Sequence, residues 1–181
     1  GQLNCWRYHE YGQLGDGTRI NAPTPVTVAG LADATALEAG ASHTCAIAAG
    51  GQAKCWGFNT SGQLGDNTLS DIQRTPVTVV GLTGATAVAA GSGHTCAIVA
   101  EGQVKCWGAN GTGQIGDSTR IDAPTPVSVT GLTGATALVA GNAHTCALVL
   151  GGQIKCWGYN EYGQLGDGTR INAPTPVTVA G

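Results

Sequence analysis

Residues 144–158 read HTCALVLGGQIKCWG, and closely similar stretches stand at 43–57 and 94–108. The last part of this pattern, Cys-Trp followed by Gly or Arg, also occurs at residues 5–7. The pattern recurs about every 50 residues, which indicates a repeat protein. A residue present in every copy is expected to serve the architecture, so function is expected where the copies differ.

The repeats divide the chain into a half-unit at 1–30 and three whole units at 31–81, 82–131 and 132–181. The half-unit is nearly identical to the later part of the last unit. It departs from residues 152–181 at Leu3, Asn4, Arg7 and His9. We expect the sequence to be a window of a longer, recently duplicated array. The alternative is a head-to-tail assembly in which the termini complete neighbouring units.

Each unit contains four short β-strand signals, separated by segments rich in Gly, Asn or Asp. In the last unit these signals cover residues 135–139, 144–149, 153–157 and 176–179. Four strands in a unit of about 50 residues predict one blade of a β-propeller. The predicted fold is therefore all-β, a propeller of four-stranded antiparallel blades, of which the chain covers about three and a half.

The two middle strands of each unit form a predicted hairpin with a three-residue loop that ends in glycine. With such a loop Ala48 faces Gln52, and counting outward places Cys45 opposite Cys55. Directly opposed residues are close enough for a disulfide after slight adjustment. The same count gives two further predicted pairs: Cys96 with Cys106, and Cys146 with Cys156. Cys5 has no partner in its half-unit, so we expect it to be unpaired or intermolecular.

Composition and charge exclude several classes of function. The net charge of −3, without a basic run, argues against a nucleic-acid partner. The sequence has no run of about 18 apolar residues, so no membrane span is expected. Regularly paired cysteines predict an oxidising compartment, and hence an extracellular or cell-surface location.

The motifs HTCAL, GxxKCWG and NxxGQLGD resemble the repeat of the regulator of chromosome condensation family over essentially the whole chain. The resemblance implies a propeller, usually of about seven blades. Intracellular members do not usually carry paired cysteines, so the chain looks like the secreted bacterial branch. Family functions include nucleotide exchange on a small GTPase, chromatin docking, ubiquitin-ligase scaffolding and UV-B reception. A secreted propeller of similar architecture inhibits a β-lactamase.

The repeated polar residues have architectural interpretations. His43, His94 and His144 lack a second ligand at metal-like spacing, so we interpret them as strand-start histidines that bond a neighbouring loop. The Asp-x-Thr segments predict turns in which the Asp side chain accepts backbone N–H groups. The four tryptophans, one per unit, predict packing between blades. We therefore predict no catalytic residue, no metal and no cofactor.

Variation among the copies falls in two loops per unit, which are expected on one rim of the propeller. Aromatic and arginine side chains there are the candidate binding residues, although neutral drift of solvated loops is an equal alternative. The candidates are Tyr8, Tyr11, Phe58, Tyr159, Tyr162, Arg19, Arg120 and Arg170. A protein partner or self-assembly is expected, and these side chains also have the chemistry to bind a glycan.

The sequence thus predicts a non-catalytic extracellular or cell-surface module with a structural or protein-binding function. One alternative is a secreted inhibitor or lectin-like binder that uses the rim aromatics. A second is an intracellular GTPase-exchange or scaffold propeller, which would require reduced cysteines.

Overall fold

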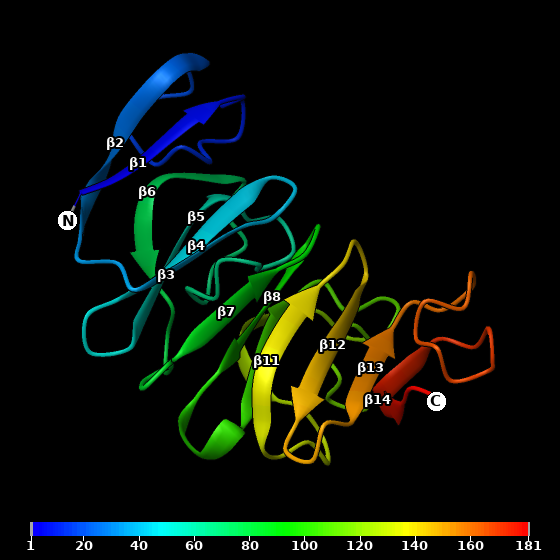
Figure 1. The fold of residues 1–181 in the computed structure, drawn as a ribbon. Helices are drawn as coiled ribbons and strands as arrows, with labels where there is room; N and C mark the ends of the chain where they lie inside the picture. Colours follow the sequence, from blue (N-terminus) through cyan, green and yellow to red (C-terminus); the bar gives the residue numbers. More distant parts are fainter. Residues whose placement is uncertain (1, 181) are drawn as a thin grey trace.

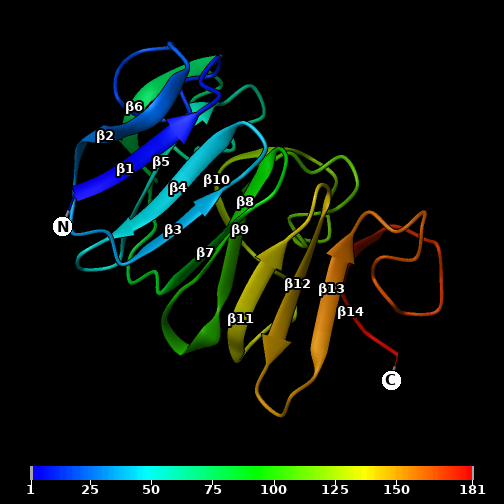
Figure 2. The same cartoon turned by 45° about the horizontal axis from the view of Figure 1, so that its top comes forward.

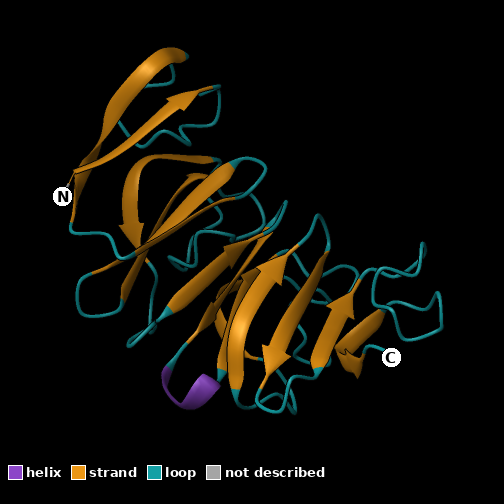
Figure 3. Ribbon diagram, in the orientation of Figure 1, coloured by secondary structure: helices purple, strands orange, loops and turns teal. Residues whose placement is uncertain are grey.

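A computed structural model describes residues 2–180 of the chain. Within this range the strands form one two-stranded sheet and three four-stranded sheets, and every pairing is antiparallel. The sheets follow one another in chain order, from the blue N-terminal pair to the red strand β14 (Figure 1). Apart from a single 3-10 turn at Ala100–Gly102, the described chain is strand and loop (Figure 3).

The strands form four groups along the chain, one for each sheet. The two-stranded sheet contains β1 (Gln2–Arg7) and β2 (Ala22–Ala32). The next sheet contains β3 (Ala36–Ala39), β4 (His43–Ala48), β5 (Gln52–Phe58) and β6 (Ile72–Thr78). The third contains β7 (Ala87–Ala90), β8 (His94–Ile98), β9 (Val104–Gly108) and β10 (Ala123–Ser128). The last contains β11 (Ala135–Ala140), β12 (His144–Val149), β13 (Ile154–Gly158) and β14 (Ala173–Thr178).

The predicted register of the central hairpin is confirmed. Ala48 pairs with Gln52, and Cys45 lies opposite Cys55. The last loop residue, Gly51, is left-handed, with φ of 76°. Glycine stands at this position because it adopts this conformation without a steric penalty. Disulfides join the opposed residues in each sheet: Cys45–Cys55, Cys96–Cys106 and Cys146–Cys156.

The outermost strand differs from the prediction. The sequence predicts residues 176–179, whereas β14 runs from Ala173 to Thr178. It begins earlier because Ala173 pairs with Gly158, after which a bulge precedes the pair of Cys156 with Val177. The two prolines within β14 lack N–H donors, and they are tolerated because β14 is at the edge of its sheet.

Neighbouring sheets pack face to face through apolar side chains, and their first strands β3, β7 and β11 lie side by side (Figure 2). Between the first two whole units, Ile47 and Leu64 meet Val88 and Trp107 in one buried cluster. The equivalent cluster of the next junction places Ile98 and Ile115 against Trp157, with further members on both sides. The hydrophobic core therefore lies between units, and no unit buries its apolar face alone.

Both glycines of the Gly-Gln-Leu-Gly motif lie at these junctions, where the next unit leaves no room for a side chain. A Cβ on Gly113 would lie 2.5 Å from Cα of Pro174, in the next unit. A Cβ on Gly116 would lie 2.7 Å from Nε1 of Trp157, and the φ of Gly116 is +79°. The intervening Ile115, which takes the leucine position, is fully buried. The motif is thus a contact surface for the following unit.

Replacing Gly116 by alanine tests this role of the motif. We expect Gly116→Ala to lower the free energy of unfolding by about 2–4 kcal/mol, because the new methyl group meets Trp157 and the backbone is left-handed. Gly111→Ala is the matched control, since a Cβ there meets nothing within 4 Å and its φ is not positive. Urea unfolding of both variants measures the difference. Equal stability of the two variants would contradict the assignment.

Candidate functional site

Each junction between units is closed by a hydrogen-bond network that we call the junction network. At the first complete junction, His43 and Gln63 of one unit meet Thr95 and Trp107 of the next. The carbonyl oxygen of Gln63 accepts from Thr95 Oγ1 at 2.8 Å and from Trp107 Nε1 at 2.9 Å. His43 Nε2 lies 2.8 Å from the same threonine hydroxyl. The histidine partner is therefore a strand hydroxyl in the next unit, and the expected bond to a neighbouring loop is wrong.

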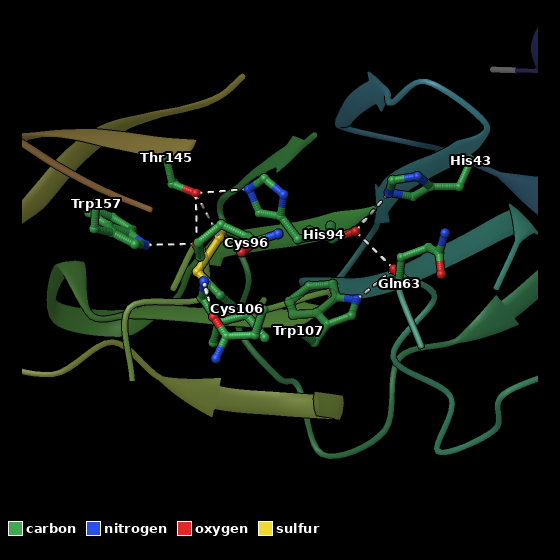
Figure 4. The surroundings of a disulfide bond; sticks show 12 residues. His43, Gln63, His94, Cys96, Cys106, Trp107, Thr145 and Trp157 are labelled. Carbon is green, nitrogen blue, oxygen red and sulfur yellow. Dashed lines mark hydrogen bonds between the residues drawn. A yellow bond between two sulfur atoms is a disulfide. The ribbon is translucent and has the colours of Figure 1, made fainter. Parts of the chain in front are cut away.

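The second complete junction repeats this arrangement around the Cys96–Cys106 disulfide (Figure 4). His94 Nε2 lies 2.9 Å from Thr145 Oγ1. Thr145 Oγ1 and Trp157 Nε1 both donate to the carbonyl of Gln114. Trp56, Trp107 and Trp157 are fully buried, as expected for packing between blades.

The hydrogen bonds fix the tautomer of the junction histidines. Thr95 donates its proton to Gln63, so it accepts from His43, whose Nε2 must carry the proton. His43 Nδ1 and His94 Nδ1 are buried without a hydrogen-bond partner. A proton added there would have no acceptor, which favours the neutral ring. Burial lowers the pKa of His43 to about 4, and burial with repulsion from the neighbouring histidines lowers the pKa of His94 to about 3.

Acid should therefore weaken the junctions. Both histidines are neutral in the folded chain and titrate near 6.5 when unfolded, so their contribution is complete above pH 6.5 and falls toward pH 3. We expect about 2 kcal/mol of stability per histidine to be lost between pH 7.5 and 5.0. His94→Gln is the control, because glutamine retains an N–H donor and does not titrate. Urea unfolding at both pH values should show a smaller loss in this variant, and an equal loss would refute the interpretation.

A second buried set lies in the loop that follows each tryptophan. Asn110 Oδ1 accepts from the backbone N–H of Ile115, and Asn110 Nδ2 donates to Asp117 Oδ1 at 3.1 Å. Asp117 Oδ1 also accepts from the backbone N–H of Thr119, which is the predicted Asp turn. The equivalent asparagines, fully buried like Asn110, are Asn59 and Asn160. These loops are anchored at one position, and sequence reasoning missed this because it treated the whole loop as variable.

His9 takes the place of this asparagine in the half-unit. Its Nδ1 accepts from the backbone N–H of Leu14 at 2.9 Å, and its Nε2 lies 2.8 Å from Asp16 Oδ1. His9 thus provides the same acceptor for a backbone N–H and the same donor to an aspartate as Asn110 does, and it is fully buried. The His9 substitution preserves the anchor.

This equivalence can be tested in a whole unit. Asn110→Ala should lower the free energy of unfolding by about 2–4 kcal/mol. The backbone N–H of Ile115 would lose its acceptor, and the carboxylate of Asp117 would lose a donor. Asn110→His should cost less than half as much, since His9 already makes both bonds in this chain. Thermal unfolding compares the two variants, and a histidine variant as unstable as the alanine variant would disprove the equivalence.

The candidate rim aromatics lie in two groups. In the first, Tyr11 contacts Tyr8 with ring centroids 6.3 Å apart and Phe58 with centroids 5.2 Å apart. This group joins the half-unit to the first whole unit. In the second, Tyr159 and Tyr162 lie 6.1 Å apart within the last unit. All three contacts are edge-to-face, and Tyr8 and Tyr162 are the exposed members, with 51% and 84% of their surface accessible.

Charged groups flank the aromatics. Tyr8 donates its hydroxyl proton to Glu10, and this bond raises the pKa of Tyr8 to about 12. Tyr159 makes the same bond to Glu161, with the same effect on its pKa. Arg19 Nε donates to the backbone carbonyl of Glu10 at 2.6 Å. A cavity of about 360 Å³ lies among these groups, lined by Tyr8, Glu10, Arg19 and Asn21.

The other two candidate arginines are exposed on the loops before β10 and β14. Arg120 Nη2 reaches the carbonyl of Asn172 in the next unit, at 3.4 Å. Sequence reasoning missed the residue that follows each arginine. Ile20, Ile121 and Ile171 are 73–75% exposed, which is unusual for so large an apolar side chain. The sequence signal for these exposed isoleucines is the Arg-Ile dipeptide, which recurs in three of the four loops.

The repeats of this chain match the profiles of one protein family along almost its whole length. The profile described as "Regulator of chromosome condensation (RCC1) repeat" matches residues 1–47, 51–98, 101–148 and 152–181. The chain belongs to the RCC1 repeat family. A second RCC1 repeat profile matches 34–63, 85–114 and 135–164.

Known proteins similar to this RCC1 chain are much longer than it is. The ultraviolet-B receptor UVR8 of Arabidopsis thaliana is 33% identical over 121 residues, which is 64% of this chain and 28% of UVR8. Yeast RCC1 (Prp20) in its complex with Kap60 superposes over 100% of this chain and 45% of its own, with a TM-score of 0.89 and 20% identity. Human WBSCR16 covers 94% of this chain and 45% of its own, with a TM-score of 0.81 and 19% identity.

A second structure of Prp20p, from Saccharomyces cerevisiae, gives the same TM-score of 0.89 at 19% identity over 100% of this chain and 47% of its own. That protein binds Gsp1p and histones. These likenesses establish the fold, and the predicted β-propeller architecture of about three and a half blades is confirmed. Three disulfides indicate an oxidising compartment. Among residues 2–180, no helix is long and apolar enough to cross a membrane.

Proposed function

We propose that this RCC1 chain is a non-catalytic protein-binding module that acts at the cell surface or outside the cell. Its units provide a rigid scaffold, and the loops at the Trp-Gly end of each unit recognise the partner. The observation that carries the proposal is the aromatic group formed by Tyr8, Tyr11 and Phe58, because two units contribute to it.

Rigidity supports this role. Every whole unit has a disulfide between its two middle strands, and every junction has its own network. The loops that carry the aromatics are in turn anchored by a buried His9, Asn59, Asn110 or Asn160. A partner that binds such preformed loops loses little conformational entropy from them, which favours affinity.

The chemistry of the rim also supports a protein partner. Tyrosine and arginine are enriched where proteins bind one another, since each combines a large contact area with directed hydrogen bonding. The rim presents both, together with the exposed isoleucines next to Arg19, Arg120 and Arg170. An interface here would bury apolar surface at its centre and leave carboxylates such as Glu161 at its edge.

The compartment is tested by peptide mapping of the chain purified from its native source without reduction. We expect three intrachain disulfides, Cys45–Cys55, Cys96–Cys106 and Cys146–Cys156. Thiols trapped as reduced at all six positions would overturn the extracellular proposal. That result would favour an intracellular exchange factor or scaffold, because the cytosol keeps thiols reduced.

The rim is tested by affinity capture from extracellular extracts with the chain as bait. Tyr11→Ala with Phe58→Ala should reduce recovery of the captured protein at least tenfold, because this pair forms the contact between two units. Leu150→Ala is the control, since Leu150 is 74% exposed on the hairpin loop at the opposite end of its strands. Equal losses in both variants, or none in the first, would contradict the rim assignment.

A lectin-like or inhibitor function is the second candidate, and the cavity beside Tyr8 favours its glycan form. Hydrogen-bonding groups of Glu10, Arg19 and Asn21 surround one aromatic ring there, which is the chemistry that a sugar ring requires. A glycan array distinguishes the two candidates: binding that Tyr8→Ala and Arg19→Ala abolish supports the lectin, and a silent array removes it.

A further inference from the structure

Two of the buried asparagines that anchor the loops also begin an acceptor motif for N-linked glycans. The sequence holds this Asn-x-Ser/Thr motif twice, as Asn-Thr-Ser at 59–61 and as Asn-Gly-Thr at 110–112. In secreted proteins such a motif is normally modified on an exposed loop. Here Asn59 and Asn110 are both 0% exposed. The motif and the burial of its asparagine are therefore in conflict.

The nitrogen that would carry the glycan is fully engaged inside its unit. Asn110 Nδ2 donates to Asp117 Oδ1 at 3.1 Å and to Thr119 Oγ1 at 3.1 Å. It also lies 3.2 Å from the carbonyl oxygen of Ile121, to which it donates as well. These acceptors use both protons of the amide nitrogen, so a sugar carbon bonded to Nδ2 would have to displace at least one of them.

The loop of Asn59 is closed in the same way. Its Nδ2 donates to Asp66 Oδ1 and to Thr68 Oγ1, each at 3.1 Å. In the other motif the third residue is engaged too, since Thr112 Oγ1 donates to Gln114 Oε1 at 2.7 Å. A modifying enzyme could reach these groups only after the loop has opened.

Each motif also lies just before the carbonyl that joins its unit to the next. Asn110 Oδ1 holds the backbone N–H of Ile115, and the preceding Gln114 carries the junction acceptor. Asn59 stands in the same relation to Leu64 and Gln63. Making room for a glycan would release the loop that positions this carbonyl, so the junction would be lost together with the anchor.

We propose that Asn59 and Asn110 are N-glycosylation sites of the unfolded chain alone, and that a glycan at either site prevents its unit from joining the next. The donor is a lipid-linked oligosaccharide, and the catalyst is an asparagine-directed oligosaccharyltransferase. A bond forms between Nδ2 and C1 of the first sugar, the bond from C1 to the lipid pyrophosphate breaks, and the amide loses one proton. Folding and modification thus compete for one nitrogen. This competition requires a secretory compartment, but it does not involve the rim or its partner.

The first test offers two forms of the chain to a purified oligosaccharyltransferase with its lipid-linked donor. The oxidised chain is the folded substrate. The reduced and carboxymethylated chain is the unfolded one, because the cysteines of the Cys45–Cys55 and Cys96–Cys106 pairs are 0% exposed and leave no room for the added groups. Glycopeptide mapping should find Asn59 and Asn110 modified at least tenfold faster in the unfolded chain. Similar rates in both forms, or no transfer to the unfolded chain, would overturn the proposal.

An exposed copy of the same tripeptide is the matched control. Glu101 and Gln103 are exposed at the hairpin loop, and Glu101 has a left-handed φ of 62°, which asparagine tolerates. Glu101→Asn with Gln103→Thr places Asn-Gly-Thr on this loop. In the folded variant the loop site should be modified while Asn110 in the same molecule stays free of glycan. Modification of Asn110 as fast as the loop site would refute its protection.

The last unit tests whether burial alone gives the protection. Asn160 is buried and bonded like Asn110, but it is followed by Glu161 and Tyr162 and so lacks the motif. Tyr162→Thr supplies the motif at a residue that is 84% exposed. Asn160 should then be modified in the unfolded chain and at least tenfold more slowly in the folded one. Rapid modification of the folded variant would contradict the assignment.

The effect on folding is measured by translation into microsomes that carry the transferase. Chains with a glycan at Asn59 or Asn110 should lack the protease-resistant form with its three disulfides, and dithiothreitol, which delays disulfide formation, should increase their number. Ser61→Ala with Asn110→His removes both motifs and keeps both anchors, so these chains should carry no glycan and should yield the resistant form. Glycosylated chains as resistant to protease as the unmodified ones would overturn the proposal.

Discussion

A single backbone carbonyl holds each pair of units together. The oxygen of Gln63 uses both of its lone pairs on the following unit, one for a threonine hydroxyl and one for an indole N–H. Both donors are buried, so the loss of this acceptor would leave two polar groups without partners in a dry interface. The oxygen of Gln114 does the same at the next junction. Much of the repeat pattern follows from the need to place this oxygen.

The requirement propagates through the unit. The carbonyl is held between two glycines, because a side chain at either would collide with the next unit. The loop that carries it is anchored by a buried asparagine, or by His9 in the half-unit. Thr95, which donates to this carbonyl, also accepts a hydrogen bond from His43, and the ring of His43 packs against Gly40. Residues far apart in the unit are thus constrained by one interface.

Much of this fold was predictable from the sequence, because the repeat is strict and the hairpin has a fixed register. The position of Cys45 opposite Cys55 follows from loop length alone. The partner of the histidine did not follow, since it lies in another unit and sequence spacing within a unit carries no information about it. The buried Asn59 looked like a member of a variable loop for a different reason: its partners lie in its own unit, but the residues beside it differ from copy to copy. The start of β14 was missed because its prolines conceal the strand signal.

The rim was predictable only as a set of candidates. Repetition identifies Tyr11 and Phe58 as variable positions, but it does not show that their rings touch across two units. The exposed isoleucines were overlooked because an apolar residue in a repeat is usually read as core. Ile20, Ile121 and Ile171 stand in the loops before β2, β10 and β14, outside the buried clusters between the units.

Both complete junctions are chemically directional: the earlier unit offers an imidazole N–H and a carbonyl, and the later unit offers a hydroxyl and an indole. Units can therefore be joined in one order only, but any unit presents the same two faces as its neighbours. A gene of this kind can gain or lose whole repeats by unequal recombination without creating a mismatched interface. Residues 1–30 and 152–181 differ at four positions only, as expected of units that are exchanged in this way. Because each junction needs this carbonyl acceptor in the same place, the protein can lengthen only by whole repeats of about 50 residues.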